Sequence, residues 1–492
     1  MTDTDSNPRS VGSEGDQLVT PLHRKMGRSA SQLFVRLLAV QLLSAASTAI
    51  LARKFSVSGF GAYSAGLAMF FVALSICDFG FGSVLARELG AGRADDGSLV
   101  RSMLRVQTVW SATVGLGVVG FALAIGFGEV RIQVLLVLAP AVAIFGLGGA
   151  RQVFYASYRT ARLGAIDVAT NIIQLVAVSL VALSGGGPVA VATTYCVMLI
   201  INTLIVVIVG LRLIDDSPSS RLVQRRMFLH SLPLGVSSLL ASAYFTIDLI
   251  IVSFLVGSQE VGYYAAATKA LGVLVMIPAL VVSTATAGLS SQAANSADLG
   301  RLSAKTWQWL TATAVPICIA MILFAPEFVT IFYGRLYQPA IPLVRILAVA
   351  GVVVAMSNVL GAAMVVTKRN RWLVIQGSFL LAFNVSSNFA LVPRFGVTAS
   401  AWLTVLTEVL VCVGAIWGLH GRIDLAPIAK TTIAPAVAVA MTVSVWWATA
   451  HWEVVSMILC GSTFALVLWI LGGWPEDLPV PLPRKLVLWR HM

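Results

Sequence analysis

Long apolar segments, separated by short polar connections, recur along the chain from residue 31 to residue 473. A helix needs about 20 predominantly apolar residues to cross a bilayer, whereas a transmembrane β-barrel shows shorter segments of alternating polarity. The pattern therefore predicts an all-α polytopic membrane protein with about 14 transmembrane helices. The predicted helices cover residues 31–52, 60–78, 106–127, 132–150, 166–184, 188–211, 231–256, 261–290, 306–326, 341–366, 372–392, 397–419, 427–449 and 454–473.

The distribution of Lys and Arg over the connections supports this set of helices. With the N-terminus placed in the cytoplasm, 25 of the 33 basic residues fall in cytoplasmic segments, counting Lys430 at the cytoplasmic start of its helix, five in outer loops and three deeper within helices. Cytoplasmic loops of membrane proteins carry an excess of Lys and Arg, and one missed helix would invert every later loop. We therefore expect a multi-pass protein with both termini in the cytoplasm.

A Gly-x-Tyr-x-Ala motif occurs twice, near the outer turns that follow the first and the seventh predicted helices. Its two copies, 201 residues apart, are Gly61, Tyr63, Ala65 and Gly262, Tyr264, Ala266. Two blocks of six helices would share one orientation, as in transporters built from parallel repeats. The predicted domains are a disordered cytoplasmic tail (1–29), an N-terminal six-helix lobe (30–213), a cytoplasmic linker (214–230), a C-terminal six-helix lobe (231–422), two extra transmembrane helices (423–473) and a cytoplasmic C-terminal tail (474–492).

Composition excludes several activities. Only 11% of the residues are charged, against about 25% in soluble proteins. The net charge of +12 is spread over the connections between apolar segments, so we expect no binding of nucleic acid. The five cysteines lie inside apolar segments without metal-ligand spacing, so no metal site and no cofactor is expected. The longest outer loop spans residues 327–340, too short for an active site outside the membrane, and we therefore expect no enzyme.

Two opposite charges lie at similar depth in neighbouring predicted helices. Asp248 and Lys269 are each about eight residues from the polar turn that joins their helices, roughly 12 Å at the rise of an α-helix. An unpaired charge in hydrocarbon is costly, so such residues face a partner or a wet cavity. Two interpretations are open: an ion pair that locks the hairpin, or a pair that faces a cavity and separates when a ligand arrives.

Four segments carry a resemblance to a known family, and the resemblance runs over the first twelve predicted helices. They are CDFGFGSVLARELGAGR (Cys77–Arg93), IDLIIVSFLVGSQEVGYYAAATKA (Ile247–Ala270), YQPAIPLVRILAVAG (Tyr337–Gly351) and LVPRFGVTASAWLTVLTE (Leu391–Glu408). The chain resembles the Wzx-like polysaccharide and O-antigen flippases, polysaccharide biosynthesis transporters of the MOP (multidrug/oligosaccharidyl-lipid/polysaccharide) exporter superfamily. The resemblance implies a MATE/MOP-like fold of two lobes around a central cavity.

The resemblance also implies a function in a bacterial cytoplasmic membrane. Members of this family move undecaprenyl-pyrophosphate-linked oligosaccharide from the inner to the outer leaflet for surface polysaccharide synthesis, by alternating access. The expected partners are the lipid-linked glycan, membrane lipids and proteins of polysaccharide polymerisation or assembly. A multidrug or lipid II exporter of the same superfamily is one alternative, and a membrane enzyme or scaffold of polysaccharide assembly is another.

Three cations are candidates for binding the pyrophosphate that the resemblance implies: Lys269, Arg345 and Arg36. Arg345 lies about five residues into its helix, where snorkelling to the outer interface is the competing interpretation. Arg36, near the cytoplasmic end of the first helix, is alternatively an interfacial anchor. For Lys269 the competing role is the ion pair with Asp248.

Three acids are candidates for coupling transport to a proton or sodium gradient: Asp248, Glu408 and Asp78. Glu408 lies about eleven residues into its helix, close to the bilayer midplane, and its competing role is a hydrogen bond in packing. Asp78 ends the second helix and is alternatively part of a turn that faces Arg87. Asp167 is expected at the membrane interface.

Overall fold

The structure is a computed structural model that describes residues 36–90, 96–126, 129–157, 159–214, 218, 221–291, 296–449 and 453–475. Over these residues the chain is helical and contains no β-strand. The predicted all-α class is therefore confirmed. The predicted tail over residues 1–29 and most of the predicted tail over residues 474–492 lie outside the described residues.

Eleven of the described helices are long and apolar enough to cross a membrane, which makes the chain a multi-pass membrane protein. Each of the predicted spans falls on a helix. The spans predicted over residues 231–256, 261–290 and 454–473 fall on helices outside this set of eleven. The exact number of membrane crossings therefore stays a prediction.

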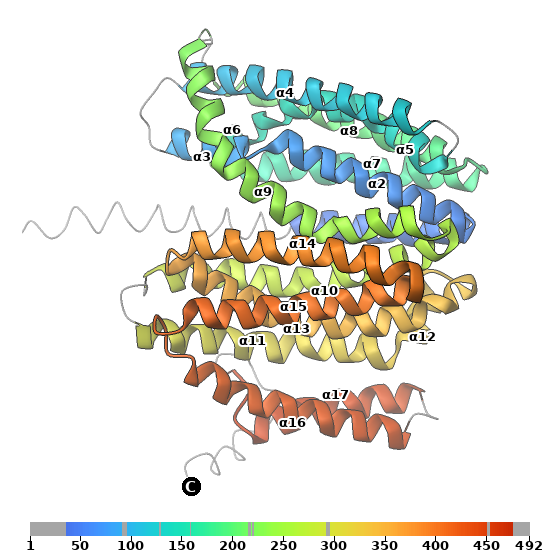
Figure 1. Ribbon diagram of the computed structural model, residues 1–492, viewed down its shortest axis with the longest axis vertical. Helices are drawn as coiled ribbons and strands as arrows, with labels where there is room; N and C mark the ends of the chain where they lie inside the picture. The colour runs from blue at the N-terminus through green and yellow to red at the C-terminus, as the bar shows by residue number, and fades with distance from the viewer. Residues whose placement is uncertain are drawn as a thin grey trace, which may run out of the picture.

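The first half of the chain forms a group of helices that we call the N-terminal bundle (Figure 1). Its members are the helix Arg36–Lys54, α2 (Val57–Asp78), α3 (Phe81–Gly90), α4 (Asp96–Ile125), α5 (Val130–Ile144), the 3-10 helix η1 (Phe145–Ala150), α6 (Arg151–Ala156), α7 (Thr160–Leu183) and α8 (Pro188–Leu211). Residues that favour helix starts precede or begin two of these helices. The hydroxyl of Ser56 caps α2 by accepting a 3.1 Å hydrogen bond from the backbone N–H of Gly59, and Pro188 occupies the first turn of α8, where its missing N–H costs nothing.

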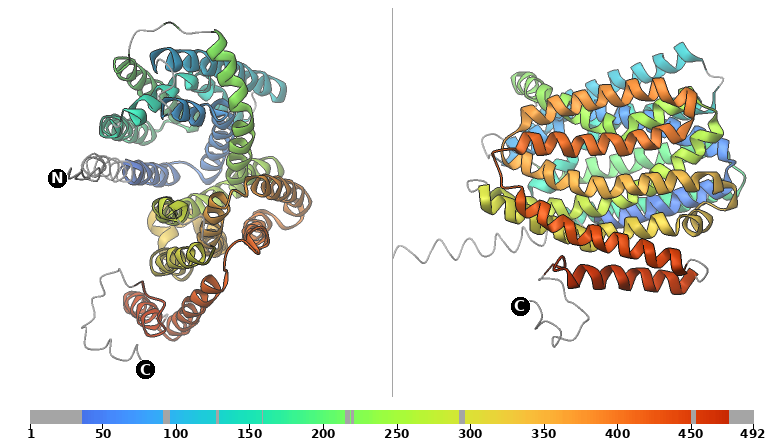
Figure 2. Two further views of the ribbon diagram at one scale, coloured as in Figure 1. Left: turned by 90° about the vertical axis from the view of Figure 1, so that its left-hand side faces the viewer. Right: turned by 60° about the horizontal axis from the view of Figure 1, so that its bottom comes forward.

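The second half forms the C-terminal bundle and a separate pair of helices. The C-terminal bundle contains α10 (Ser258–Ser291), α11 (Ser296–Leu323), α12 (Ala325–Phe332), η2 (Arg335–Ala340), α13 (Ile341–Val366), α14 (Asn370–Phe395) and α15 (Val397–Leu419). The pair consists of α16 (Ala426–Thr449) and α17 (Glu453–Ile470), of which α16 packs against α11. Figure 2 shows this pair at the edge of the molecule, next to the C-terminal bundle.

The long helix α9 (Arg221–Leu255) connects the two bundles. It packs against α3, α4 and α2 of the N-terminal bundle and against α14 of the C-terminal bundle. In Figure 1 it runs from the top of the N-terminal bundle down to the level of α14. Since α9 contacts both bundles, these contacts do not decide where one lobe ends and the other begins. The lobe boundaries predicted at residues 213 and 231 stay predictions.

The bundles touch along α2 and α10, where the repeated motif brings two glycines together. A Cβ atom on Gly61 would lie 2.1 Å from the backbone oxygen of Ser258, and one on Gly262 would lie 2.2 Å from the backbone oxygen of Val57. Only glycine fits such an approach of two backbones. The motif copies that predicted a repeat therefore form a contact between the bundles, at the end where both helices begin.

Candidate functional site

A cavity of about 560 Å³ lies between the two bundles. Its walls come from the helix Arg36–Lys54 and α2 on one side and from α9, α10, α12, α13, α14 and α15 on the other. Three of the charged residues singled out in the sequence line it: Asp248, Lys269 and Glu408. The remaining candidates, Arg36, Arg345 and Asp78, are not among its lining residues.

Lys269 projects from α10 toward the N-terminal bundle. Its Nζ atom lies 5.9 Å from the centre of the Phe71 ring on α2, a distance at which an ammonium group is attracted to the face of an aromatic ring. Among the described residues, no carboxylate forms an ion pair with Lys269, and Asp248 is no exception. The ion pair that would lock the hairpin is therefore not formed in this structure.

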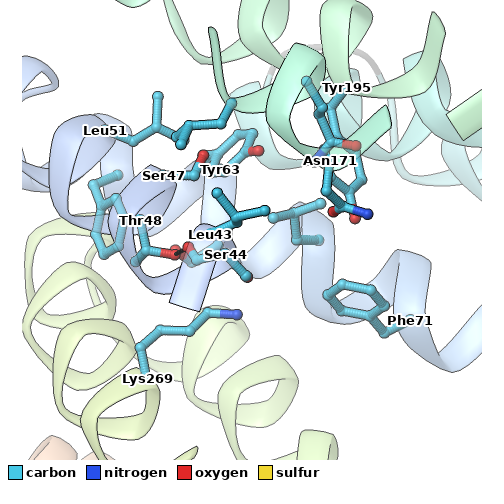
Figure 3. Close-up of a pocket in the computed structure, with 15 residues that line it drawn as sticks. Leu43, Ser44, Ser47, Thr48, Leu51, Tyr63, Phe71, Asn171, Tyr195 and Lys269 are labelled. Atoms are coloured by element: carbon cyan, nitrogen blue, oxygen red, sulfur yellow. Dashed lines mark hydrogen bonds between the residues drawn. The ribbon is translucent and has the colours of Figure 1, made fainter. Parts of the chain in front are cut away.

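A second, smaller cavity of about 60 Å³ lies beside Lys269 within the N-terminal bundle. Neutral polar side chains make up much of its wall: Ser44, Ser47, Thr48, Tyr63, Ser64, Asn171, Gln174 and Tyr195. Lys269 is the one lining residue that comes from the C-terminal bundle. Figure 3 shows its ammonium group directed at the N-terminal helices, between Ser44 and Phe71. Lys269 therefore borders both cavities.

The sequence reasoning missed this polar wall. Asn171 and Gln174 are amides in the middle of an apolar span, three residues apart on α7, and this spacing places them on one helix face. That signal was present in the sequence. Ser44, Ser47 and Thr48 carry a weaker one, because Ser and Thr are common in transmembrane helices as packing residues.

Asp248 is buried on α9 and receives a hydrogen bond from a neutral group. The hydroxyl of Thr404 on α15 donates to Oδ2 at 3.2 Å. The other oxygen, Oδ1, is buried and has no hydrogen-bond partner among the described residues. This carboxyl group therefore keeps an unused acceptor beside the central cavity.

Glu408 is buried on α15 and joins three helices through hydrogen bonds. The hydroxyl of Tyr244 on α9 donates to Oε1 at 2.8 Å, and the hydroxyl of Ser357 on α13 donates to Oε2 at 2.9 Å. The sequence offered no local partner for this residue, since both donors are far away along the chain. Glu408 forms no ion pair with a described residue. Its two carboxyl oxygens instead accept hydrogen bonds from neutral hydroxyl groups.

Arg36 lies in a buried polar network inside the N-terminal bundle. Its guanidinium forms a 2.6 Å ion pair with Asp167 and donates to the hydroxyl of Tyr155 at 2.7 Å. Arg151 also binds Asp167, at 2.8 Å, and donates to the side-chain oxygen of Asn202. The side chain of Asp167 is 4% exposed, so other helices enclose it, and its expected depth at the membrane interface stays a prediction. The two arginines, remote in sequence, bury it by pairing with it.

The other two candidates lie away from the cavity. Arg345 is exposed, and its Nε donates to the backbone oxygen of Ile322 at 3.2 Å, which favours the interfacial interpretation. Asp78 ends α2, and Phe79 follows it in the left-handed region. No ion pair joins Asp78 to Arg87 in the described part of the chain. The guanidinium of Arg87 instead lies 3.7 Å from the carboxylate oxygen Oε1 of Glu88.

The fold is that of transporters of the MOP superfamily. A structure of lipid II flippase MurJ in an inward closed conformation is similar, with a TM-score of 0.69 and 11% sequence identity over 89% of this chain and 98% of that one. An inward-facing multidrug resistance MATE family transporter of the MOP superfamily gives a TM-score of 0.61 and 16% identity, over 81% of this chain and 99% of that one. At such low identities these likenesses concern the fold.

The sequence itself identifies the family. The profile of the family "Polysaccharide biosynthesis protein" matches residues 26–294, more than half of the chain, and the MatE profile matches residues 233–390. The chain belongs to the polysaccharide biosynthesis protein family. It is a membrane transporter or flippase of the MOP superfamily, as the resemblance implied, and the related families and structures are transporters rather than enzymes. No curated protein matches the chain.

Proposed function

We propose that this protein is a flippase that moves an undecaprenyl-pyrophosphate-linked oligosaccharide from the inner to the outer leaflet of a bacterial cytoplasmic membrane. The observation that carries the proposal is the position of Lys269. Its ammonium group borders the cavity between the bundles and has no ion pair with a described residue. A cation in a membrane span without a counter-ion is costly, and binding of an anionic substrate would offset that cost.

The chemistry of the cavity wall agrees with a substrate that has three different parts. The pyrophosphate would bind Lys269 by charge-assisted hydrogen bonds, which are roughly twice as strong as neutral ones. The glycan would occupy the cavity, where Gln41, Asn384 and Thr407 supply polar side chains. The prenyl chain would remain in lipid, since an apolar chain gains nothing from entering a polar cavity. Rocking of one bundle against the other would switch access between the two sides.

Coupling to a gradient belongs to the same proposal. Asp248 and Glu408 border the cavity as carboxyl groups held by hydroxyl donors, so either can exchange a proton or accept a sodium ion without breaking an ion pair to a described residue. Asp78 lies at a helix end away from the cavity, which makes it the weakest of the three candidates. Arg345 and Arg36 also lie outside the cavity walls, so they are not proposed to hold the pyrophosphate in this conformation.

The proposed function also implies the partners of the protein, its orientation in the membrane and its need for cofactors. The enzymes that polymerise or assemble the glycan are the expected partners on the outer side. Both termini are proposed to lie in the cytoplasm, and the arginine-rich connections support this orientation. No resident cofactor is required, because the movement of a substrate between leaflets changes no covalent bond.

A deletion strain tests the proposal. Lipid-linked saccharides are labelled, and their leaflet is assigned by exposing intact spheroplasts to a glycan-cleaving enzyme that cannot cross the membrane. We expect the labelled lipid to accumulate in a protected form without the protein and to become cleavable when the wild type is restored. If no lipid-linked glycan accumulates and the strain instead becomes sensitive to cationic drugs, the protein is a drug exporter and the polysaccharide substrate is wrong.

A further inference from the structure

A groove of about 820 Å³ lies on the surface of the N-terminal bundle, between α4 and the first two turns of α9. Its walls are formed by Leu104, Arg105, Val106, Thr108, Val109, Trp110, Thr113, Leu147, Arg221, Gln224 and Phe228. None of these residues lines the central cavity. The groove is therefore a second concave site, separate from the proposed path of the substrate.

The two ends of this groove differ in chemistry. One end carries Arg105 from α4 together with Arg221 and Gln224 from α9. The other end is apolar and open, with Val109 69% exposed. A pair of positive charges at one end and an apolar channel at the other match the two parts of an anionic phospholipid.

The aromatic floor gives the groove a fixed shape. The rings of Trp110 and Phe228 meet edge to face with centroids 6.1 Å apart, and the indole N–H of Trp110 donates to the backbone oxygen of Ile76 at 2.7 Å. Aromatic side chains of this kind are common at the level of lipid headgroups, where one part is apolar and another is polar. The floor is therefore held by α2 and α9 and does not depend on a ligand.

The position of the groove selects between the possible phosphate-bearing ligands. Figure 1 shows α4 at the edge of the N-terminal bundle farthest from the C-terminal bundle, so the groove faces the surrounding lipid and not the space between the bundles. It lies at the end of the spans where the arginine-rich connections begin, which the positive-inside rule assigns to the cytoplasmic leaflet. Basic pockets at this level bind anionic headgroups.

We propose that this groove is a binding site for one anionic phospholipid of the cytoplasmic leaflet. The phosphate group lies between Arg105 and Arg221, and one acyl chain follows the channel past Val109 and Thr113. Because Arg105 belongs to α4 and Arg221 to the connecting helix α9, the lipid joins two elements that are far apart in the sequence. The inference does not depend on which substrate the central cavity carries.

Native mass spectrometry of the purified full chain tests this site. Phosphatidylglycerol and phosphatidylethanolamine of the same acyl composition are titrated separately against the wild type and against R105Q, R221Q and the double variant. One arginine near an anionic membrane surface contributes roughly fivefold in affinity, so we expect each single variant to bind phosphatidylglycerol about fivefold more weakly. The wild type should bind phosphatidylethanolamine more weakly than phosphatidylglycerol.

Arg225 provides the matched control, because it is an exposed arginine one turn further along α9 that does not line the groove. R225Q should lose less affinity than R221Q, because Arg225 does not line the groove and cannot contact the phosphate directly. Equal losses in R225Q and R221Q would show a diffuse charge effect and would overturn the proposal. Equal affinity of the wild type for phosphatidylglycerol and phosphatidylethanolamine would overturn the proposal as well. This comparison uses the wild type alone, so it does not depend on whether a variant folds.

The remaining arm concerns the lipid-linked pyrophosphate. Undecaprenyl pyrophosphate is added to the wild type loaded with phosphatidylglycerol, and the same is done with K269A. If it displaces phosphatidylglycerol equally from both proteins, the groove binds the substrate and the proposal of a separate phospholipid site is wrong. If phosphatidylglycerol stays bound, the two sites are independent, as proposed.

Discussion

The N-terminal bundle and the wall of the central cavity hold their charges in different ways. In the N-terminal bundle, Asp167 pairs with Arg36 and Arg151, and Asn202 donates a further hydrogen bond to it at 3.1 Å. Around the central cavity, hydroxyl groups donate hydrogen bonds to Asp248 and Glu408, and Lys269 has no ion-pair partner among the described residues.

This difference separates charges that hold the fold from charges that are free to react. A carboxylate between two arginines is neutralised in place, and removing it leaves two cations in a poorly hydrated site. A carboxyl group bonded to hydroxyls can change its protonation or bind an ion with small rearrangements. An ammonium beside a cavity can accept an anion. The N-terminal network should therefore govern stability, and the residues around the cavity should govern transport.

The largest expected effect on stability comes from Asp167. The change Asp167→Asn leaves Arg36 and Arg151 without their shared carboxylate, and breaking a buried ion pair by removing one partner costs about 3–5 kcal/mol. We expect a matching drop in the free energy of unfolding, measured by denaturant titration of the purified protein in detergent micelles. Glu260→Gln is the control, because Glu260 is exposed and forms no ion pair with a described residue. Unchanged stability of Asp167→Asn would remove the distinction between the N-terminal bundle and the wall of the central cavity.

The next effect concerns transport and comes from Lys269. In the proposed complex Lys269 pairs with the substrate pyrophosphate, and truncating one partner of such a charge pair costs about 2–5 kcal/mol. Lys269→Ala should therefore reduce the rate of flipping by roughly 30-fold or more while the protein remains folded. Lys269→Arg retains the charge and should restore part of the rate. Arg345→Gln is the matched control, because Arg345 is a cation of the same bundle that lies outside the cavity. Equal losses in Lys269→Ala and Arg345→Gln, assayed for leaflet exchange in proteoliposomes, would refute a specific role for Lys269.

How far the fold could be predicted from the sequence follows from the length of the apolar segments. A span of about 20 apolar residues has one favourable conformation in a bilayer, a helix that satisfies its own backbone groups, and each predicted span falls on such a helix. The charges Asp248, Lys269 and Glu408 were found because ionisable residues are rare at this depth. Their common position around one cavity agrees with that reasoning.

The polar network of the N-terminal bundle could not be predicted in the same way. Asp167 is seven residues from the start of α7, and a position along one span does not tell whether other helices enclose the side chain. Its burial depends on Arg36, 131 positions earlier in the chain, and on the side chain of Asn202 on α8. Such pairings between distant segments leave no mark in the periodicity of a single segment. The sequence motif shared by Gly61 and Gly262 likewise indicated a repeat, but it did not indicate that the two glycines contact each other.

The smallest change in stability, and the sharpest test of the comparison, is expected from Glu408→Gln. The amide keeps one oxygen that can accept the hydrogen bond from Tyr244, so the free energy of unfolding should fall by only about 1 kcal/mol. The amide can neither release a proton nor supply a charge to a sodium ion. If Glu408 couples transport to a gradient, proteoliposomes with this variant should flip substrate at a rate that no longer responds to an imposed proton or sodium gradient, while the wild type responds. If the variant responds as the wild type does, Glu408 is a packing residue like Asp167, and Asp248 becomes the first candidate for coupling, ahead of Asp78.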